Sequence, residues 1–493
     1  MYLKGSYAGA TTDALGKFSF STTKEGEHTL IISFLSYESA EKTMQVTSMV
    51  DLKITLREDV TSLDAVALNA GTFSAGDNSK VTVLKPLDVV TTAGVAGDLV
   101  AALQTLPGTQ PVGEDGRLFV RGGTPGETAV YIEGLRVFQP YTASANNLPS
   151  RGRYSPFLFD GITFSTGGYS AEFGQALSGV LLLNTINEPA QTETNISLMT
   201  VGAGLGHTQK WQKSSLSLSA GYINLAPYLE LVPNNQKATF KKPYESLGGE
   251  TVYRKHLKNG IFKWYTAYEL TKFNVLQPDI DKPEPVNFDL QNENLYTNLS
   301  YKGTLGNGWS INPGLSASYS RNEFLIDLIG IDNREIAANL KLKAGKRFSN
   351  RIKLNFGGDH LYTNFSEDYL DPETPEVNLE VIPQISAGFA EADFIFSKKF
   401  AAKAGFRTTY LHLKKDIYWL TRLSMALKAR KDGQFSLAYG EYLQQPEVEL
   451  LKFDNSLKPE TAAHYILNYQ WTRPGYTFRR SEEHTSELQS PLD

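Results

Sequence analysis

Apolar and polar residues alternate over most of the chain after about Gln191. Side chains of a β-strand point to opposite faces of the sheet in turn, so alternation with a period of two predicts strands. The clearest examples are residues 214–222, 295–301, 338–344, 352–356, 400–406, 435–439 and 465–469. We expect roughly a dozen antiparallel strands between Gln191 and Trp471.

The connections between these expected strands are of two kinds. Residues 305–309 and 430–433 contain the glycine, asparagine or aspartate of tight turns. Residues 278–292 and 367–381 are longer, acidic and proline-rich, so they predict loops. Short turns at one end of a sheet and long loops at the other are typical of outer-membrane β-barrels. The pattern therefore favours such a barrel over a soluble β-sandwich, and no propeller-type repeat is visible.

The beginning of the chain has a different pattern of apolar and polar residues. Residues 9–56 predict a small all-β unit. Its expected strands lie within residues 13–20, 28–34, 44–46 and 52–56. Residues 57–80 lose this periodicity and gather small polar residues, so they predict a linker. Within the linker, residues 63–68 form a short apolar patch.

The stretch between the linker and the alternating region contains two glycine-rich motifs. In residues 118–141, two short apolar strands flank Arg121, Gly122 and Gly123, where glycine allows the backbone to turn. The second motif, residues 164–174, precedes an apolar run at 177–183. Before both motifs, residues 98–106 have the apolar spacing of a helix that ends before a Pro-Gly pair.

Composition narrows the class of protein further. A length of 493 residues suggests roughly two to four domains. A formal charge of −5 gives no electrostatic case for nucleic acid, and no apolar run is long enough to predict a membrane-spanning helix. The absence of cysteine excludes thiolate metal sites, disulfides and cysteine nucleophiles. Since no P-loop, dinucleotide fingerprint or metal-spaced histidine pair occurs either, we expect no enzyme activity, cofactor or metal site.

The two motifs, in this order, resemble the plug domain of TonB-dependent outer-membrane transporters. The β-unit before them resembles the carboxypeptidase-regulatory-like sandwich found ahead of many Bacteroidetes transporters, including SusC-like ones. The resemblance implies a mainly β fold with a small N-terminal β-sandwich, a mixed α/β plug and an incomplete antiparallel transmembrane β-barrel. The expected domains are residues 1–58 (truncated sandwich), 59–80 (linker), 81–188 (plug), 189–479 (partial barrel) and 480–493 (tail).

The resemblance also implies a function and partners. Such transporters import a nutrient across the outer membrane when TonB, energised from the inner membrane, pulls on the plug. The substrate classes left open are a glycan, a peptide, a siderophore or cobalamin. Further expected partners are the lipid bilayer and a surface lipoprotein lid. The residues expected to contact TonB are Ala65, Val66, Ala67 and Leu68.

Charged residues of the plug are expected to pair with the barrel wall, because an unpaired buried charge costs several kcal/mol. The residues expected to hold the plug are Arg121, Gly122, Gly123, Glu133, Gly134, Glu172 and Gly174. Further charged candidates are Arg117, Arg136, Arg151, Arg153, Glu114, Asp115, Glu127 and Asp160. Substrate binding is the alternative role for any of these charged groups.

Two other functions stay open at this point. The chain could be a non-transporting surface β-protein, such as an adhesin or structural barrel, or a secreted carbohydrate-processing enzyme. The N-terminal and C-terminal sequences of the chain also lead to expectations. The start shows no signal peptide, which an outer-membrane protein needs. Residues 480–490 match the translation of a sequencing adapter, so we expect native sequence to end near Arg479 and no strand to follow.

Overall fold

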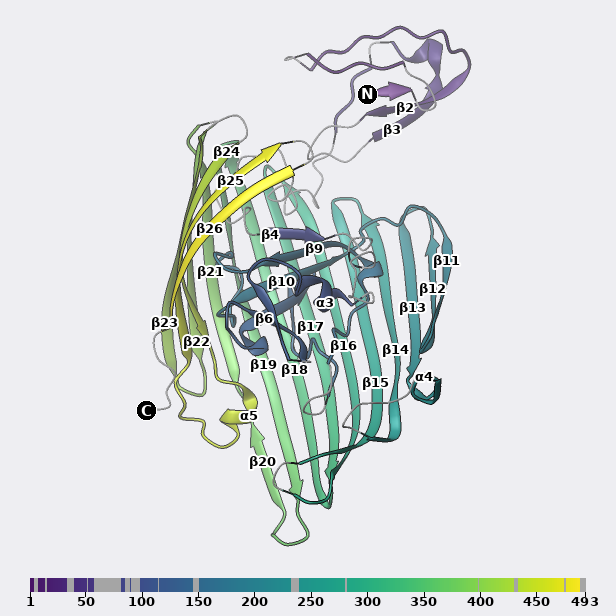
Figure 1. Cartoon of the computed structure of the whole chain (residues 1–493). Helices are drawn as coiled ribbons and strands as arrows, with labels where there is room; N and C mark the ends of the chain where they lie inside the picture. The colour runs from purple at the N-terminus through teal and green to yellow at the C-terminus, as the bar shows by residue number, and fades with distance from the viewer. Residues whose placement is uncertain are drawn as a thin grey trace. The chain divides into compact units, whose positions relative to one another are not determined.

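The computed structural model describes residues 1–3, 8–13, 16–32, 40–50, 52–56, 81–84, 89, 98–113, 115–144, 150–231, 239–279, 282–397, 399–429, 433–473 and 476–487. The chain forms two compact units, Met1–Thr72 and Phe73–Asp493. The first holds a small sheet, and the second holds a mixed domain together with a large curved sheet (Figure 1).

The first unit contains a three-stranded antiparallel sheet. Its strands are β1 (Tyr2–Leu3), β2 (Glu27–Ile32) and β3 (Ala40–Gln45), followed by the short helix η1 (Val46–Ser48). Leu3, Leu30 and Ile32 form its core. The predictions of strands within 13–20 and at 52–56 are wrong: Phe20, Leu52 and Ile54 pack against this core without joining the sheet.

The mixed domain, called the plug from here on, is built around a five-stranded sheet of order β4-β9-β10-β7-β8. Its strands are β4 (Val81–Leu84), β7 (Thr128–Ile132), β8 (Leu135–Val137), β9 (Phe159–Ser165) and β10 (Gly179–Thr185). Strand β10 runs parallel to β7 and antiparallel to β9. A separate hairpin joins β5 (Thr109–Val112) to β6 (Asp115–Val120).

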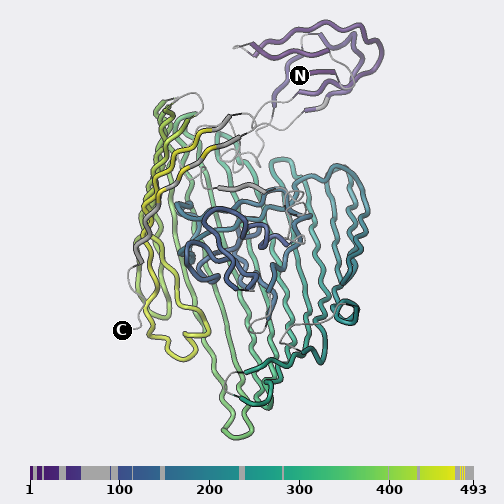
Figure 2. Tube along the Cα trace, in the orientation of Figure 1, coloured from purple at the N-terminus to yellow at the C-terminus, as the bar shows by residue number. Residues whose placement is uncertain are grey.

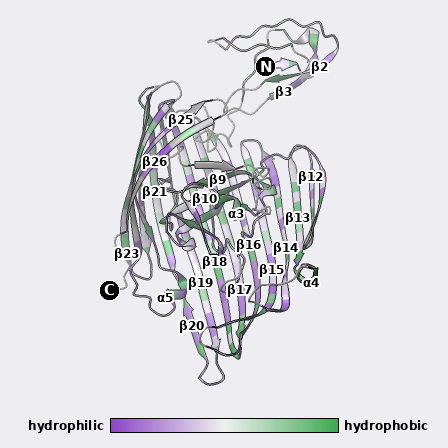
Figure 3. Ribbon diagram, in the orientation of Figure 1, coloured by the Kyte–Doolittle hydropathy of each residue, from purple (hydrophilic) through white to green (hydrophobic). Residues whose placement is uncertain are grey.

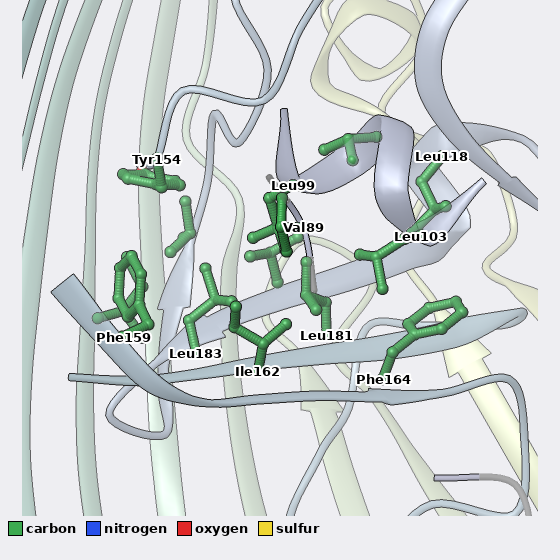
Figure 4. Close-up of a cluster of buried hydrophobic side chains, with 14 of the residues drawn as sticks. Val89, Leu99, Leu103, Leu118, Tyr154, Phe159, Ile162, Phe164, Leu181 and Leu183 are labelled. Carbon is green, nitrogen blue, oxygen red and sulfur yellow. The ribbon is translucent and has the colours of Figure 1, made fainter. Parts of the chain in front are cut away.

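A short helix, α3 (Leu99–Leu103), supplies one side of the plug core. Its N-cap Asp98 accepts a hydrogen bond from the Val100 amide at 3.0 Å, which satisfies one of the free amides at the helix start. Apolar side chains of α3 then pack with side chains of β6, β9 and β10 (Figure 4). The core residues seen there include Leu99, Leu103, Leu118, Phe159, Ile162, Phe164, Leu181 and Leu183.

The large sheet contains sixteen strands among the described residues, with β11 and β26 at its edges and β20 paired to β19 beside the main path. It curves around the plug (Figures 1 and 2). The strands are β11 (Glu193–Met199), β12 (Gly202–Lys210), β13 (Ser214–Asn224), β14 (Thr239–Leu257), β15 (Gly260–Gln277), β16 (Val286–Gly306), β17 (Trp309–Ile326), β18 (Ile329–Ser349), β19 (Ile352–Leu370), β20 (Val377–Val381), β21 (Gln384–Ile395), β22 (Phe400–Leu411), β23 (Asp416–Lys428), β24 (Gly433–Gln444), β25 (Glu460–Arg473) and β26 (Tyr476–Glu487). Two connections contain short helices, α4 (Ala226–Leu231) and α5 (Val448–Leu451).

The two faces of this sheet differ in chemistry, as the alternating pattern predicts. On β18, Asn339 and Lys341 are buried and contact the plug, whereas Leu340 and Leu342 are exposed on the opposite face. The same alternation of hydrophilic and hydrophobic positions runs along neighbouring strands (Figure 3). The predicted mainly β fold class, with plug and barrel-type sheet, is confirmed. Among the described residues, no helix is long and apolar enough to cross a membrane.

Two predicted loops are shorter than expected. Strand β16 already begins at Val286, so the second half of the segment 278–292 is strand. Strand β19 continues to Leu370, and β20 occupies the end of the segment 367–381. Both segments were predicted as loops because of their acidic residues and prolines, but backbone pairing with long neighbouring strands extends the ladder into them.

The tail also differs from the expectation. Strand β26 pairs with β25 from Arg473↔Tyr476 to Ala462↔Glu487, so the residues after Arg479 continue a strand. A backbone ladder needs no particular side-chain pattern, and for that reason a polar segment can extend the sheet.

Candidate functional site

The first glycine-rich motif is a tight turn at the end of β6. Arg121 and Gly122 both adopt positive φ angles, 54° and 85°, a conformation that glycine tolerates and a non-glycine residue rarely adopts. The Arg121 guanidinium donates a hydrogen bond to Thr166 Oγ1 at 2.8 Å. Thr166 belongs to the second motif, so this contact joins the two motifs inside the plug.

Glu127 connects the first motif to the residues that follow the second motif. It ends the short helix η2 (Pro125–Glu127), and its Oε1 accepts from the Thr124 amide at 2.7 Å as half of a capping box. Its Oε2 accepts from the Ser178 hydroxyl, and its carbonyl accepts from the amides of Leu177 and Ser178. One residue thus fixes the loop that follows the second motif.

Gly123 lies at the closest approach between these loops, and its replacement by alanine is expected to separate them. A Cβ at this position would overlap Ser178 Oγ and Glu127 Oε2. We expect Gly123→Ala to destabilise the plug by about 1–3 kcal/mol, as overpacking does elsewhere. Limited proteolysis of the plug measures the effect. In Gly161→Ala, where the nearest atom lies 3.4 Å from the added Cβ, cleavage should stay near the wild-type rate; equal rates in both variants would contradict the prediction.

Glu133 connects the plug to the large sheet. Its side chain is fully buried, and its Oε1 accepts hydrogen bonds at 2.7 Å from the Thr185 amide, the Thr185 hydroxyl and Lys263 Nζ of β15. Lys302 Nζ of β16 lies 3.4 Å from Oε2. Burial raises the pKa of the Glu133 carboxyl, but Lys263, Lys302 and the hydrogen bonds outweigh it and lower the pKa to about 2. The group is therefore an anion held between two strands.

Glu172 forms a second connection of the same kind. Its Oε1 lies 2.7 Å from Lys341 Nζ and its Oε2 lies 2.7 Å from Lys343 Nζ, both on β18. Lys341 also donates to the Gly134 carbonyl at 2.9 Å. Gly134 has a φ of 83°, and the turn it forms brings this carbonyl to the sheet. Gly134 and Glu172, predicted from separate motifs, therefore contact the same lysine.

Gly174 allows a buried arginine to approach the plug. Arg407 of β22 donates to the carbonyl groups of Ala171 and Glu172 at 3.3 and 3.2 Å, and its Nη2 lies 2.9 Å from Asp359 Oδ1. A Cβ on Gly174 would lie 2.6 Å from Arg407 Nε. The absence of a side chain at Gly174 is what makes room for the guanidinium.

Other charged residues named from the sequence make contacts that do not involve Glu133 or Glu172. Arg153 pairs with Glu269 and donates to Asn292 Oδ1 at 3.0 Å, which is a further contact between plug and sheet. Arg117 pairs with Asp115 within the plug hairpin at 2.6 Å. Ala65, Val66, Ala67, Leu68 and Glu114 lie outside the described residues.

The sequence analysis missed the partners on the sheet. They are Lys263, Lys302, Lys341, Lys343, Asp359, Arg407 and Arg422. Arg422 lies over the rings of Tyr169 and Tyr442, 5.0 and 4.5 Å from their centroids, and donates to the Tyr169 carbonyl at 3.2 Å. The sequence pattern could have identified the cations among them. Each stands at a polar position of an alternating strand, between residues of the apolar outer face, and therefore lies on the inner face.

Aromatic side chains form a row on the inner face of β14–β17, toward the end of the sheet that carries the longer connections. The ring centroids of Tyr244, Phe273, Phe288 and Phe324 are successively 6.2, 6.1 and 5.8 Å apart. Further along the same inner face, Thr271, Asn294 and Ser318 are more than nine-tenths buried. Each has a polar side-chain atom without a hydrogen-bond partner among the described residues. The Arg153–Glu269 ion pair lies beside these residues, because Asn292 is the register partner of Thr271 and Glu269 is the register partner of Asn294.

Comparison with known proteins agrees with this arrangement. Residues 1–68 match the family described as CarboxypepD_reg-like domain, and residues 77–180 match the TonB-dependent Receptor Plug Domain. No curated protein matches the chain in sequence.

Several solved structures share the fold. A variant of the ferric enterobactin receptor PfeA from Pseudomonas aeruginosa is 12% identical, with a TM-score of 0.61 over 82% of this chain and 71% of its own. The outer membrane transporter YddB from Escherichia coli is 10% identical, with a TM-score of 0.64 over 83% and 69%. The ferric yersiniabactin uptake receptor FyuA from Yersinia pestis is 13% identical, with a TM-score of 0.62 over 83% and 73%. Identities this low establish a shared fold.

Fold and plug together are similar to one class of protein, the plug-bearing β-barrel receptors of outer membranes. More particularly, the chain joins a carboxypeptidase-regulatory-like domain to a TonB-dependent receptor plug domain, which confirms the resemblance seen in the sequence. Receptors of this kind are transporters rather than enzymes, and they work with TonB and bind small-molecule substrates. The match supports an outer-membrane location and a role in import.

Proposed function

We propose that this protein imports a nutrient across the outer membrane in a TonB-dependent cycle. The observation that carries the proposal is the chemistry of the plug–sheet interface. Glu133 and Glu172 each bind two lysines of the sheet. Ion pairs and hydrogen bonds of this kind can be exchanged for contacts with water when two surfaces separate, as at transient interfaces between domains.

In the proposed cycle, TonB binds Ala65–Leu68 by adding a strand to its own sheet, a mode in which backbone hydrogen bonds supply affinity. The pull is then transmitted to the plug, and the paired carboxylates separate from the lysines of β15, β16 and β18. Arg121 and Glu127 act inside the plug and keep the two motifs together while this happens. The roles of Gly123 and Gly174 are to permit these close contacts, and those of Gly122 and Gly134 are to adopt the positive φ angles of the turns.

The substrate enters from the end of the sheet with the longer connections, which is the outer side of outer-membrane barrels. The partly buried rings of Phe288 and Phe324 offer it apolar contacts. The aromatic character of this row favours a glycan or a peptide over a siderophore or cobalamin. A surface lipoprotein lid is the proposed additional partner.

Removal of the apolar patch in the linker tests the proposal. We expect deletion of residues 63–68 to reduce uptake to the background of a strain that lacks the protein, because TonB then has no strand to bind. Binding of the same substrate to purified protein should not change. Uptake is measured with panels of labelled oligosaccharides, peptides, ferric siderophores and cobalamin.

A deletion of equal length, residues 69–74 of the same linker, is the control, and uptake should be retained. Undiminished uptake after deletion of residues 63–68 would show that these residues are not the TonB contact. Cell-surface binding without uptake of any compound in the wild type would instead favour the adhesin or structural-barrel alternative.

A further inference from the structure

Three polar side chains form a hydrogen-bonded cluster on three adjacent strands of the large sheet. Ser386 Oγ lies 2.9 Å from His360 Nδ1 and 2.9 Å from His412 Nε2. The two imidazole rings are 5.8 Å apart in an edge-on arrangement, and Tyr410 packs against His412 at 4.7 Å. We call His360, Ser386 and His412 the outer histidine cluster.

This cluster lies on the face of the sheet that is turned away from the plug. Leu361, Ile385 and Leu411, each adjacent in sequence to a cluster residue, pack together with Phe138 of the plug. Because successive side chains of a strand point to opposite faces, His360 and Ser386 point outward. The strand register pairs His360 with Ser386 and Ser386 with Tyr410, so the outward groups are direct neighbours.

The surroundings of the cluster on this face are apolar. Leu340 is the register partner of His360 on β18 and is exposed. Further along the same face, Phe406 stacks on Trp419, with ring centroids 5.3 Å apart. Ionisable side chains within an apolar, lipid-facing band are costly, and they are retained where they have a function.

The cluster lies at the outer edge of this band. His412 directly follows the end of β22, and Ser386 is the third residue of β21 after the connection that contains β20. Longer connections mark the outer side of such a barrel, so the cluster is level with the headgroups of the outer leaflet. The turn that begins at His412 also carries Lys414 and Lys415.

Two other uses of this chemistry fit the structure less well. A serine next to histidine suggests an ester-cleaving nucleophile, but such a site needs free amide donors for the oxyanion. Here the backbone of Ser386 is committed to ladders with both neighbouring strands. A metal site needs more ligands, and the described residues contain no group of three or more histidine, cysteine or acidic side chains suited to a metal ion.

We infer that the outer histidine cluster binds a phosphate monoester on the headgroup of an outer-leaflet lipid. The Ser386 hydroxyl bridges the two imidazoles, donating to one ring nitrogen and accepting from the other. The ring that accepts carries its own N–H on the nitrogen turned away from Ser386, and this N–H is left as a donor for a phosphate oxygen. Lys415 adds a positive charge in the same turn, and Tyr410 supplies a ring at headgroup level, where aromatic residues are favoured. The protein would thus carry a bound lipid on its outside, separate from the import path.

Native mass spectrometry of the purified, delipidated protein tests this inference. The probes are bis-phosphorylated lipid A and the same lipid after enzymatic dephosphorylation. The wild type should bind one molecule of the phosphorylated form, with a preference of about tenfold over the dephosphorylated form, as expected for charge-assisted hydrogen bonds. The double variant His360→Gln/His412→Gln should lose this preference.

His207→Gln is the matched control, because His207 also makes a cross-strand hydrogen bond, to Thr194 at 2.8 Å, but on another part of the sheet. The preference should survive in this variant. Ser386→Ala keeps both imidazoles and removes their shared partner, so we expect an intermediate loss of the preference for phosphorylated lipid. If the double variant misfolds, this single variant tests the inference. An unchanged preference in folded cluster variants, or full competition by millimolar inorganic phosphate, would overturn the inference of a lipid site.

Discussion

Replacement of Glu133 by alanine is expected to destabilise the assembly of plug and sheet by about 3–5 kcal/mol, the range for breaking a buried ion pair. The side chain of Lys263 is 2% exposed and that of Lys302 is 15% exposed. Without the carboxylate, Lys263 becomes a buried charge with no counter-ion. Thermal unfolding of the purified protein measures the loss.

Two further variants separate this cause from general damage. Glu188→Ala removes a carboxylate that is 64% exposed and paired with Lys210, so its effect should stay within about 1 kcal/mol. Glu133→Ala combined with Lys263→Met removes both members of the buried pair and should recover part of the lost stability. If the double variant is less stable than Glu133→Ala alone, the stranded-charge explanation is wrong.

The same carboxyl gives a pH dependence with a defined sign. Its pKa is lowered from an ordinary 4.5 to about 2 in the folded protein. The stability it contributes is therefore fully present above pH 4.5 and is lost as the pH falls toward 2. Over this window the difference in unfolding temperature between the wild type and Glu133→Ala should shrink.

Arg407→Ala is expected to have an effect of similar size, about 3–5 kcal/mol. Arg407 is 1% exposed, and its loss leaves the buried Asp359 carboxylate and the carbonyl groups of Ala171 and Glu172 without this donor. The loop of the second motif should then detach from β22. Limited proteolysis within residues 164–178 of the folded protein, followed by mass spectrometry, reports this detachment.

Arg407→Lys is the informative comparison, because a lysine keeps the charge but lacks the planar fork that reaches Asp359 and the two carbonyl groups together. We expect it to restore stability only in part. Full restoration by lysine would show that charge alone matters at this position. A wild-type cleavage pattern in Arg407→Ala would show that the loop is held by other contacts.

The sequence predicted the strands of the large sheet well, because one face meets apolar surroundings and the other meets the plug. Leu340, Lys341 and Leu342 illustrate how this division appears as strict alternation. The positions of strand ends were predicted less well. Backbone pairing carried β16 and β19 into acidic, proline-rich segments, and hydrogen bonds of the backbone leave no trace in side-chain composition.

The plug residues of the site could be selected from the sequence, but their partners could not. Glu133 stands in a motif whose glycine and neighbouring strand mark it, whereas Lys263 lies 130 positions further along the chain. Which inner-face residue meets Glu133 depends on how far each strand is shifted along its length relative to the plug. Turns and strand register around the whole sheet fix this shift, and a single sequence does not reveal it.

The two lysines bound by Glu133 also bear on how the sheet is assembled. Lys263 lies on β15, and Lys302 lies on β16 opposite Ile261, two residues before Lys263. A slip of one residue between these strands would turn one of the two lysines toward lipid and leave the carboxylate short of a charge. A single plug residue thus penalises misaligned pairing of two strands during biogenesis. The register of β15 and β16 is thereby coupled to the presence of one plug carboxylate.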